Sequence, residues 1–157
     1  SEWFNAAPSA DVTASSEFRD KNGILYPARN VVDRQARVGG DSVIWIANEG
    51  DGATIELRWR TPIEAKQFIL YNITSAPEKT ILVQNSKILL YYSGIEVGSV
   101  SSTGPLSPHG TPVSIRPTKI DVARITITKS SGTITRKPLV GLAEVETIAR
   151  IFSITSN

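Results

Sequence analysis

The side chains of this chain that could contact a ligand fall mostly between its apolar segments, where loops are expected. The segment 25–43 is the richest in them, because it combines an aromatic ring, arginines, an aspartate and a glycine pair. Guanidinium, carboxylate and amide groups form planar, two-pronged hydrogen bonds, and a tyrosine ring adds a flat apolar face. The candidates for ligand contact are Tyr26, Arg37, Asp41, Asn48, His109 and Arg136.

A simpler interpretation exists for these residues. Charged side chains on loops are normally solvated, which accounts for Arg37, Asp41 and Arg136 without any ligand. Tyr26 is also explained by packing beneath its own loop. For any single residue this simpler interpretation is the default.

The same inventory gives little support to catalysis. The chain has one histidine and no cysteine, so zinc catalysis lacks ligands and a Cys–His pair is excluded. A G-x-S-x-G motif and a phosphate-binding glycine loop are also absent. Paired carboxylates stay open, since any two of the 15 acidic residues could meet in space. The sequence therefore favours a binding domain over an enzyme.

Length and composition indicate one globular domain over residues 1–157. Hydrophobic residues make up 40% and charged residues 20% of the chain, close to globular averages. The formal net charge is only +2 and the basic residues are scattered, which argues against a nucleic-acid partner. No window contains the roughly 20 apolar residues that a membrane span requires. Without cysteine, the fold depends on its apolar core and not on disulfides.

The sequence predicts that β-strands hold the candidate loops in position. Residues Ala53–Arg60 alternate apolar and polar side chains, as in a strand with one buried face, and Ala123–Lys129 does the same. Phe68–Tyr71 and Ile88–Tyr92 are shorter apolar runs that predict central strands. Turn residues separate these runs, at Gly50-Asp51-Gly52, Thr61-Pro62, Ala76-Pro77, Ser93-Gly94, Gly104-Pro105, Pro108-His109-Gly110 and Ser131-Gly132. This pattern predicts an all-β, antiparallel sandwich or barrel.

Only residues 139–151 have a spacing that would also suit a helix, and periodicity alone leaves that segment open. The first few residues and 152–157 are expected to be frayed ends.

Several local signatures occur in an order that resembles a known superfamily. They are Val12-Thr13-Ala14-Ser15-Ser16, Ala28-Arg29-Asn30-Val31-Val32-Asp33, Trp45, the strand 53–59 with Thr61-Pro62, and Val140-Gly141-Leu142-Ala143-Glu144-Val145. Together they resemble the galactose-binding-like, or discoidin (coagulation-factor C-type), superfamily. More narrowly, the chain is similar to the discoidin-like domain appended to PIG-L-type deacetylases and secreted carbohydrate-active proteins. The resemblance implies a jelly-roll β-sandwich and a strand, not a helix, at 139–151.

The resemblance also implies a function. Such domains are typically non-catalytic carbohydrate-binding modules of larger extracellular proteins, and they recognise an oligosaccharide or polysaccharide through loops at one end of the sandwich. Asn72 is a further ligand candidate, because the family carries L-Y-D-R-P in a loop where this chain has Leu70-Tyr71-Asn72-Ile73-Thr74. Since this difference falls where loops carry specificity, the sugar cannot be inferred from the family. Protein adhesion or a structural accessory role is the alternative for the same fold. Membrane insertion is not expected, because the predicted loop tips 39–41 and 108–110 are small and polar.

The resemblance further implies a structural calcium ion, held by a turn aspartate, nearby carbonyls and a glutamate of the last strand. Asp33 and Glu144 match those positions. Arg34 replaces the usual glycine, and either Arg29 or Arg34 could neutralise Asp33 in an ordinary ion pair instead. Asn72-Ile73-Thr74 also fits an N-glycosylation sequon, which only a eukaryotic secretory pathway would use.

Overall fold

The computed structural model describes residues 2–33, 43–74, 82–131 and 139–152. The described residues form antiparallel strands and two short 3₁₀ helices, which confirms the all-β prediction. In chain order the elements are β1 (Phe4–Asn5), η1 (Ala7–Ser9), β2 (Asp11–Ala14), η2 (Ala28–Val32), β3 (Trp45–Ile46), β4 (Thr54–Tyr71), β5 (Leu82–Tyr92), β6 (Ile95–Ser102), β7 (Thr111–Ser131), β8 (Gly141–Leu142) and β9 (Glu144–Ile151).

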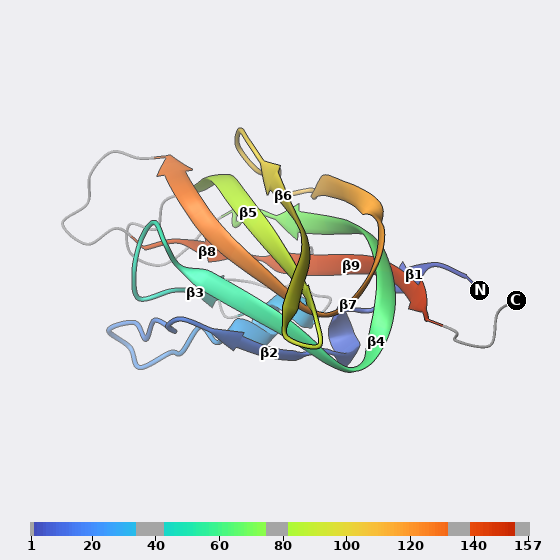
Figure 1. The fold of residues 1–157 in the computed structure, drawn as a ribbon. Coiled ribbons are helices and arrows are strands. Elements are labelled where there is room, and N and C mark those ends of the chain that lie inside the picture. The colour runs from blue at the N-terminus through green and yellow to red at the C-terminus, as the bar shows by residue number, and fades with distance from the viewer. Residues whose placement is uncertain (1, 34–42, 75–81, 132–138, 153–157) are drawn as a thin grey trace, which may run out of the picture.

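Strands β4 and β7 run through both layers of a sandwich (Figure 1). The first part of β4 pairs with β2 and with the second part of β7, and its second part pairs with β9 and the first part of β7. One layer therefore has the order β2-β4-β7-β5-β6, and the other has the order β1-β9-β4-β7. The short strands β3 and β8 form a separate pair.

The alternation of residues 53–60 is confirmed as one buried and one open face of β4. Ile55 and Leu57 are fully buried, whereas Arg58 and Arg60 are exposed. The predicted turn at Thr61-Pro62 is wrong, because β4 continues through both residues. The register shifts between Arg58 and Ile63, so Pro62, which has no N–H, lies where β7 supplies no registered partner.

The β5–β6 hairpin turns at Ser93-Gly94, as the sequence predicts. Both residues have positive φ, 50° and 79°, which matches the primed turns that suit the twist of a hairpin. β6 is the edge strand that the sequence analysis did not predict. Its apolar residues Ile95 and Val97 are 68% and 42% exposed, so they give no burial pattern to recognise.

Residues 139–151 form strands β8 and β9, which settles the open choice in favour of the strand that the resemblance implied. The expected fraying of the N-terminal residues is wrong for Phe4 and Asn5, which pair as β1 with β9. The Asn5 Oδ1 accepts the backbone N–H of Ala7 at 3.1 Å and of Thr147 at 2.9 Å. The beginning of the chain is thereby tied to its last strand.

The core lies between the two layers. Its largest fully buried side chains are Trp45, Phe68, Ile46, Ile55, Leu57, Leu70, Ile88, Ile120, Ile125, Ile127, Leu142 and Val31. Trp59 is 4% exposed and its Nε1 donates to the Ala6 carbonyl at 2.9 Å, so this ring also belongs to the core. Burial of this apolar surface is the main stabilising force of the sandwich.

Candidate functional site

Two described loops project together from one end of the sandwich (Figure 1). They comprise residues 15–26, after β2, and residues 47–53, before β4, and this surface is called the loop end below. The first loop is fixed to β3, which leads into the second loop, because the Phe18 N–H donates to the Ile46 carbonyl at 2.8 Å. The Tyr26 N–H closes the first loop on itself by donating to the Phe18 carbonyl at 3.0 Å. A rigid sandwich thus holds both loops in a fixed relation.

Ser16 of the first loop forms hydrogen bonds with residues of the second loop. Its carbonyl accepts the Trp45 Nε1–H at 3.0 Å, and its Oγ accepts the Asn48 backbone N–H at 2.9 Å. The Ser16 hydroxyl also donates to Glu49 Oε1 at 2.9 Å, and the Ser15 hydroxyl donates to the same oxygen. The serines of the T-A-S-S signature therefore fasten the second loop to the first.

Asp20 braces the first loop from within. Its Oδ1 accepts the backbone N–H groups of Asn22 at 2.8 Å and Ile24 at 2.9 Å, and its Oδ2 accepts the Tyr26 hydroxyl at 3.0 Å. These bonds, that to Ile24 foremost, lower the pKa of Asp20 below its ordinary value. The carboxylate is therefore charged at neutral pH, and its bracing is lost only as the pH falls through that lowered pKa.

The braced loop presents polar side chains to solvent. On the first loop Lys21 and Asn22 are exposed and Ile24 at the same tip is 43% exposed, and Asn48 is exposed on the second loop. Arg19 is partly committed, since its Nη1 donates to the Gly23 carbonyl at 2.7 Å. The loop end therefore offers amide and ammonium groups beside a small apolar surface. Residues 19–24 were not among the residues predicted to contact a ligand, although Asp20-Lys21-Asn22-Gly23 is a recognisable turn sequence.

Tyr26 does not serve as an open platform. Its side chain is 2% exposed, stacks with Phe18 at a centroid distance of 6.2 Å, and supplies its hydroxyl to Asp20. The ligand-contact prediction for Tyr26 is therefore corrected to a supporting role, as the simpler interpretation has it. A ring that packs beneath the loop orients the loop without touching a ligand.

Asn72 is likewise internal. Its side chain is 2% exposed, and its Nδ2 donates to the carbonyls of Leu106 at 3.0 Å and Val83 at 3.4 Å. Its Oδ1 accepts the Val83 N–H at 3.4 Å, so the amide replaces a missing ladder partner. The ligand-contact prediction for Asn72 is corrected for that reason, and the folded domain offers no accessible nitrogen at the sequon.

His109 lies on a different loop, between β6 and β7, and not within the loop end. It is exposed, and its backbone N–H donates to Ser107 Oγ at 3.0 Å. Asn48 is therefore the one described ligand candidate that is exposed at the loop end. Arg37, Asp41 and Arg136 lie outside the described residues, and their ligand roles stay predictions.

The two carboxylates expected at a calcium site lie on neighbouring elements. Asp33 follows the end of η2, Glu144 begins β9, and η2 is in contact with β9. Glu144 is 3% exposed. No group of three or more His, Cys, Asp or Glu side chains suited to a metal occurs within the described ranges.

Comparison with known proteins adds the family and the fold. A family model described as "Domain of unknown function (DUF7402)" matches residues 5–148. No curated protein matches the chain.

Among the described residues, no helix is long and apolar enough to cross a membrane.

Several solved structures with the same fold are carbohydrate-binding modules and lectins. A fucose-binding module of Streptococcus pneumoniae is 23% identical, with a TM-score of 0.70 over 92% of this chain and 96% of that one. The family 32 carbohydrate-binding module of NanJ from Clostridium perfringens, solved with galactose, is 16% identical, with a TM-score of 0.68 over 92% and 98%. An F-lectin from striped bass serum is 13% identical, with a TM-score of 0.73 over 100% and 52%. These similarities establish the galactose-binding-like β-sandwich that the sequence signatures indicated.

Proposed function

We propose a function for this chain from its fold and loops, since it belongs to the family described as Domain of unknown function (DUF7402), a name that assigns no activity. The chain is a non-catalytic domain that binds glycans at the loop end. The observation that carries the proposal is the bracing of that surface by Asp20 and Ser16, which holds exposed amides in place before any ligand arrives. Ordering a flexible loop costs binding energy, and a braced loop avoids that cost.

The exposed groups suit a sugar. Side-chain amides such as those of Asn22 and Asn48 both donate and accept hydrogen bonds. They can therefore pair with the hydroxyl groups around a sugar ring, which also donate and accept. The exposed part of Ile24 offers an apolar contact for the C–H face of a ring. Arg37, Asp41 and Arg136 are proposed to complete the site.

The fold neighbours support the same reading of the domain. A fucose-binding module, a carbohydrate-binding module in complex with galactose and a lectin share the sandwich. The domain is accordingly a targeting module of a larger extracellular protein that acts on or adheres to an oligosaccharide or polysaccharide. The link to PIG-L-type deacetylases stays a prediction from the sequence resemblance.

A glycan-array screen followed by titration calorimetry tests this proposal. The wild-type domain is expected to bind one class of glycan weakly, in the millimolar to micromolar range typical of a shallow single site. Asn22→Ala and Asn48→Ala should each weaken binding about tenfold, because each removes hydrogen bonds of about 1–1.5 kcal/mol. Asp20→Ala should weaken binding while leaving the core intact, because it releases the loop.

Arg60→Ala is the matched control, since that side chain is 91% exposed on β4 outside the loop end and should leave binding unchanged. Equal binding by wild type and all three loop variants would refute the loop end as the site. Binding to no glycan would instead favour the protein-adhesion role.

A structural calcium ion is the second part of the proposal. Asp33 and Glu144 would supply its carboxylates, and a buried Glu144 is a suitable donor for a hard cation. Calcium at 100 times its Kd would raise the free energy of unfolding by about 2.7 kcal/mol, and the melting temperature by several degrees. Calorimetric melting in calcium and in EDTA measures this, with magnesium and Glu144→Gln as controls. Identical melting in calcium and EDTA, or a calcium shift that Glu144→Gln retains, would contradict the site.

A further inference from the structure

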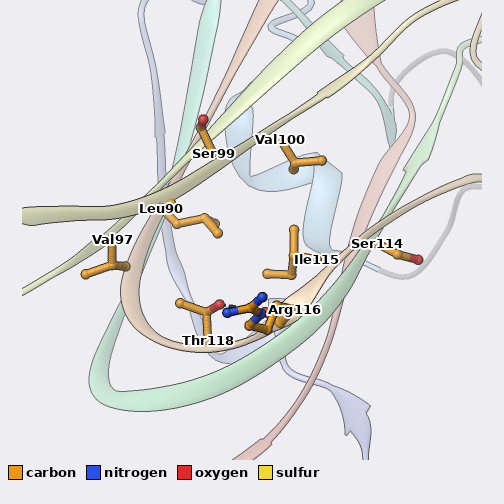
Figure 2. Close-up of a pocket in the computed structure, with 9 residues that line it drawn as sticks. Leu90, Val97, Ser99, Val100, Ser114, Ile115, Arg116 and Thr118 are labelled. Atoms are coloured by element: carbon orange, nitrogen blue, oxygen red, sulfur yellow. Dashed lines mark hydrogen bonds between the residues drawn. The ribbon is translucent and has the colours of Figure 1, made fainter.

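A cavity of about 250 Å³, called the flank cavity below, lies between β6 and the first part of β7 (Figure 2), and none of the residues that line it belongs to the loop end. One wall is formed by β6, an edge strand, and the other by the first part of β7. Here β6 pairs only with β5, and this part of β7 pairs only with β4. The cavity is thus the gap between two strand edges that do not hydrogen-bond to each other.

The β7 wall is a pronounced bulge. Ala65 of β4 is opposite Thr118, and Gln67 is opposite Ser114, so three residues of β7 face a single residue of β4. One of those three is Pro117, which has no N–H to give to a ladder. Bulges of this kind re-aim side chains and are frequent beside functional sites.

The β6 wall also contains a bulge. Leu90 is paired with Gly98 and Tyr91 with Glu96, which leaves Val97 as an extra residue on β6. A Cβ at position 98 would have only one atom within 4 Å, Leu90 Cδ1 at 3.5 Å. Gly98 therefore leaves the space above Leu90 open, and a strand glycine often marks a close approach by a ligand.

The lining of the cavity has an apolar part and a polar part. Figure 2 shows Leu90, which comes from β5, and Ile115 of the β7 wall on the apolar side, with Arg116 and Thr118 together on the β7 bend. The Thr118 hydroxyl donates to the Arg116 carbonyl at 2.5 Å, which helps to hold the bend. The Ser99 hydroxyl is exposed on the β6 wall.

Arg116 carries the only charge among the residues that line the cavity. Four other arginines form ion pairs with carboxylates, whereas Arg116 forms none with the described residues. A guanidinium that is not committed to a carboxylate of its own chain is suited to a planar, two-pronged contact with a carboxylate from outside.

We propose that this flank cavity is a second binding site, separate from the loop end, and that it takes a single sugar ring bearing a carboxylate, such as a uronic acid. Arg116 binds the carboxylate, Ser99 and Thr118 meet ring hydroxyls, and Ile115 contacts the C–H face above the buried Leu90. Pockets for drug-sized ligands span about 300–1,000 Å³, so the smaller volume here suits one ring and not a chain. The inference rests on the proposal that the domain binds carbohydrate. It adds a second class of ligand, acidic sugars, and a second binding site, the flank cavity.

Two-dimensional ¹⁵N–¹H NMR titration tests the site with three probes, glucuronate, glucose and acetate. Glucuronate is expected to shift the amide signals of residues 97–100, 114–116 and 118 in a saturable manner. Glucose lacks the carboxylate and acetate lacks the ring, so each should bind at least tenfold more weakly. Arg116→Ala should weaken glucuronate binding about tenfold, and Gly98→Leu should abolish it by filling the space above Leu90. Arg60→Ala is the matched control and should bind as wild type does.

Several results would overturn the inference. Absence of glucuronate shifts at the cavity would do so, as would unchanged affinity in a folded Arg116→Ala variant. Glucose binding as tightly as glucuronate would remove the role of the charge, and acetate binding as tightly would reduce the cavity to a simple anion site. Glucuronate shifts confined to the loop end would reject the cavity and leave the proposed function standing. Loss of loop-end binding in Asn48→Ala, with cavity shifts retained, would separate the two sites.

Discussion

Replacing Gly141 with alanine is expected to abolish folding or to lower the free energy of unfolding by about 3 kcal/mol, the upper part of the usual range for overpacking. A Cβ at this position would lie 2.1 Å from the Trp45 carbonyl oxygen and 3.1 Å from Ile46 Cα. Both atoms belong to backbone of the opposite strand β3, so no side-chain rotation relieves the clash. The glycine of the Val140-Gly141-Leu142 signature is therefore required by the spacing of two strands. Chemical denaturation followed by tryptophan fluorescence measures the effect.

Gly98→Ala is the matched control for this experiment. It adds the same methyl group to a strand, but the nearest atom is a side-chain carbon at the ordinary distance of 3.5 Å. Its free energy of unfolding should stay within about 0.5 kcal/mol of wild type, as for most surface substitutions. A Gly141→Ala variant as stable as Gly98→Ala would show that β3 and β8 can separate freely, and would refute the packing argument.

Replacing Trp45 with alanine is expected to cost about 3–5 kcal/mol, the range observed for large aromatic side chains in cores. The ring is fully buried, and its Nε1–H holds the carbonyl of Ser16 at 3.0 Å. Truncation therefore removes core packing and one support of the loop end in the same step. Urea denaturation at several temperatures, with circular dichroism as the second probe, measures the loss.

Trp45→Phe separates these two contributions. Phenylalanine retains most of the buried ring but cannot donate to Ser16, so a smaller loss is expected, with the hydrogen bond contributing about 1 kcal/mol. At a temperature where the variant is fully folded, glycan binding at the loop end should weaken while the core stays intact. Equal stability of Trp45→Ala and wild type, or a Trp45→Phe variant more damaged than Trp45→Ala, would contradict this division of roles.

Much of the fold could be predicted from the sequence, because burial on one face leaves a period of two. The alternation at 53–60 and at 123–129 corresponds to strands in the structure. The turn predicted at Thr61-Pro62 failed because a local proline signal does not distinguish a turn from a bend at which a strand changes layers. The edge strand β6 was missed because Ile95 and Val97 are exposed and only Val100 packs against the core, so the strand has no alternating pattern.

The candidate site was harder to predict, since a polar side chain has the same sequence signal whether it faces a ligand or its own backbone. Tyr26 and Asn72 are used internally, to brace a loop and to replace ladder partners. The bracing role of Asp20 depends on the return of the chain at Ile24 and Tyr26, which a turn sequence suggests but does not locate. The flank cavity depends on two bulges whose register only paired strands define.

The continuity of β4 and β7 through both layers determines how the domain loses its structure. Because each strand has one half in each layer, neither layer can detach while the other keeps its full set of partners. The two layers share the described strands β4 and β7, so the sandwich is expected to unfold as one cooperative unit. A substitution at the flank cavity or at the loop end is therefore expected either to change only the local loops and bulges or to lower the free energy of unfolding of the whole domain.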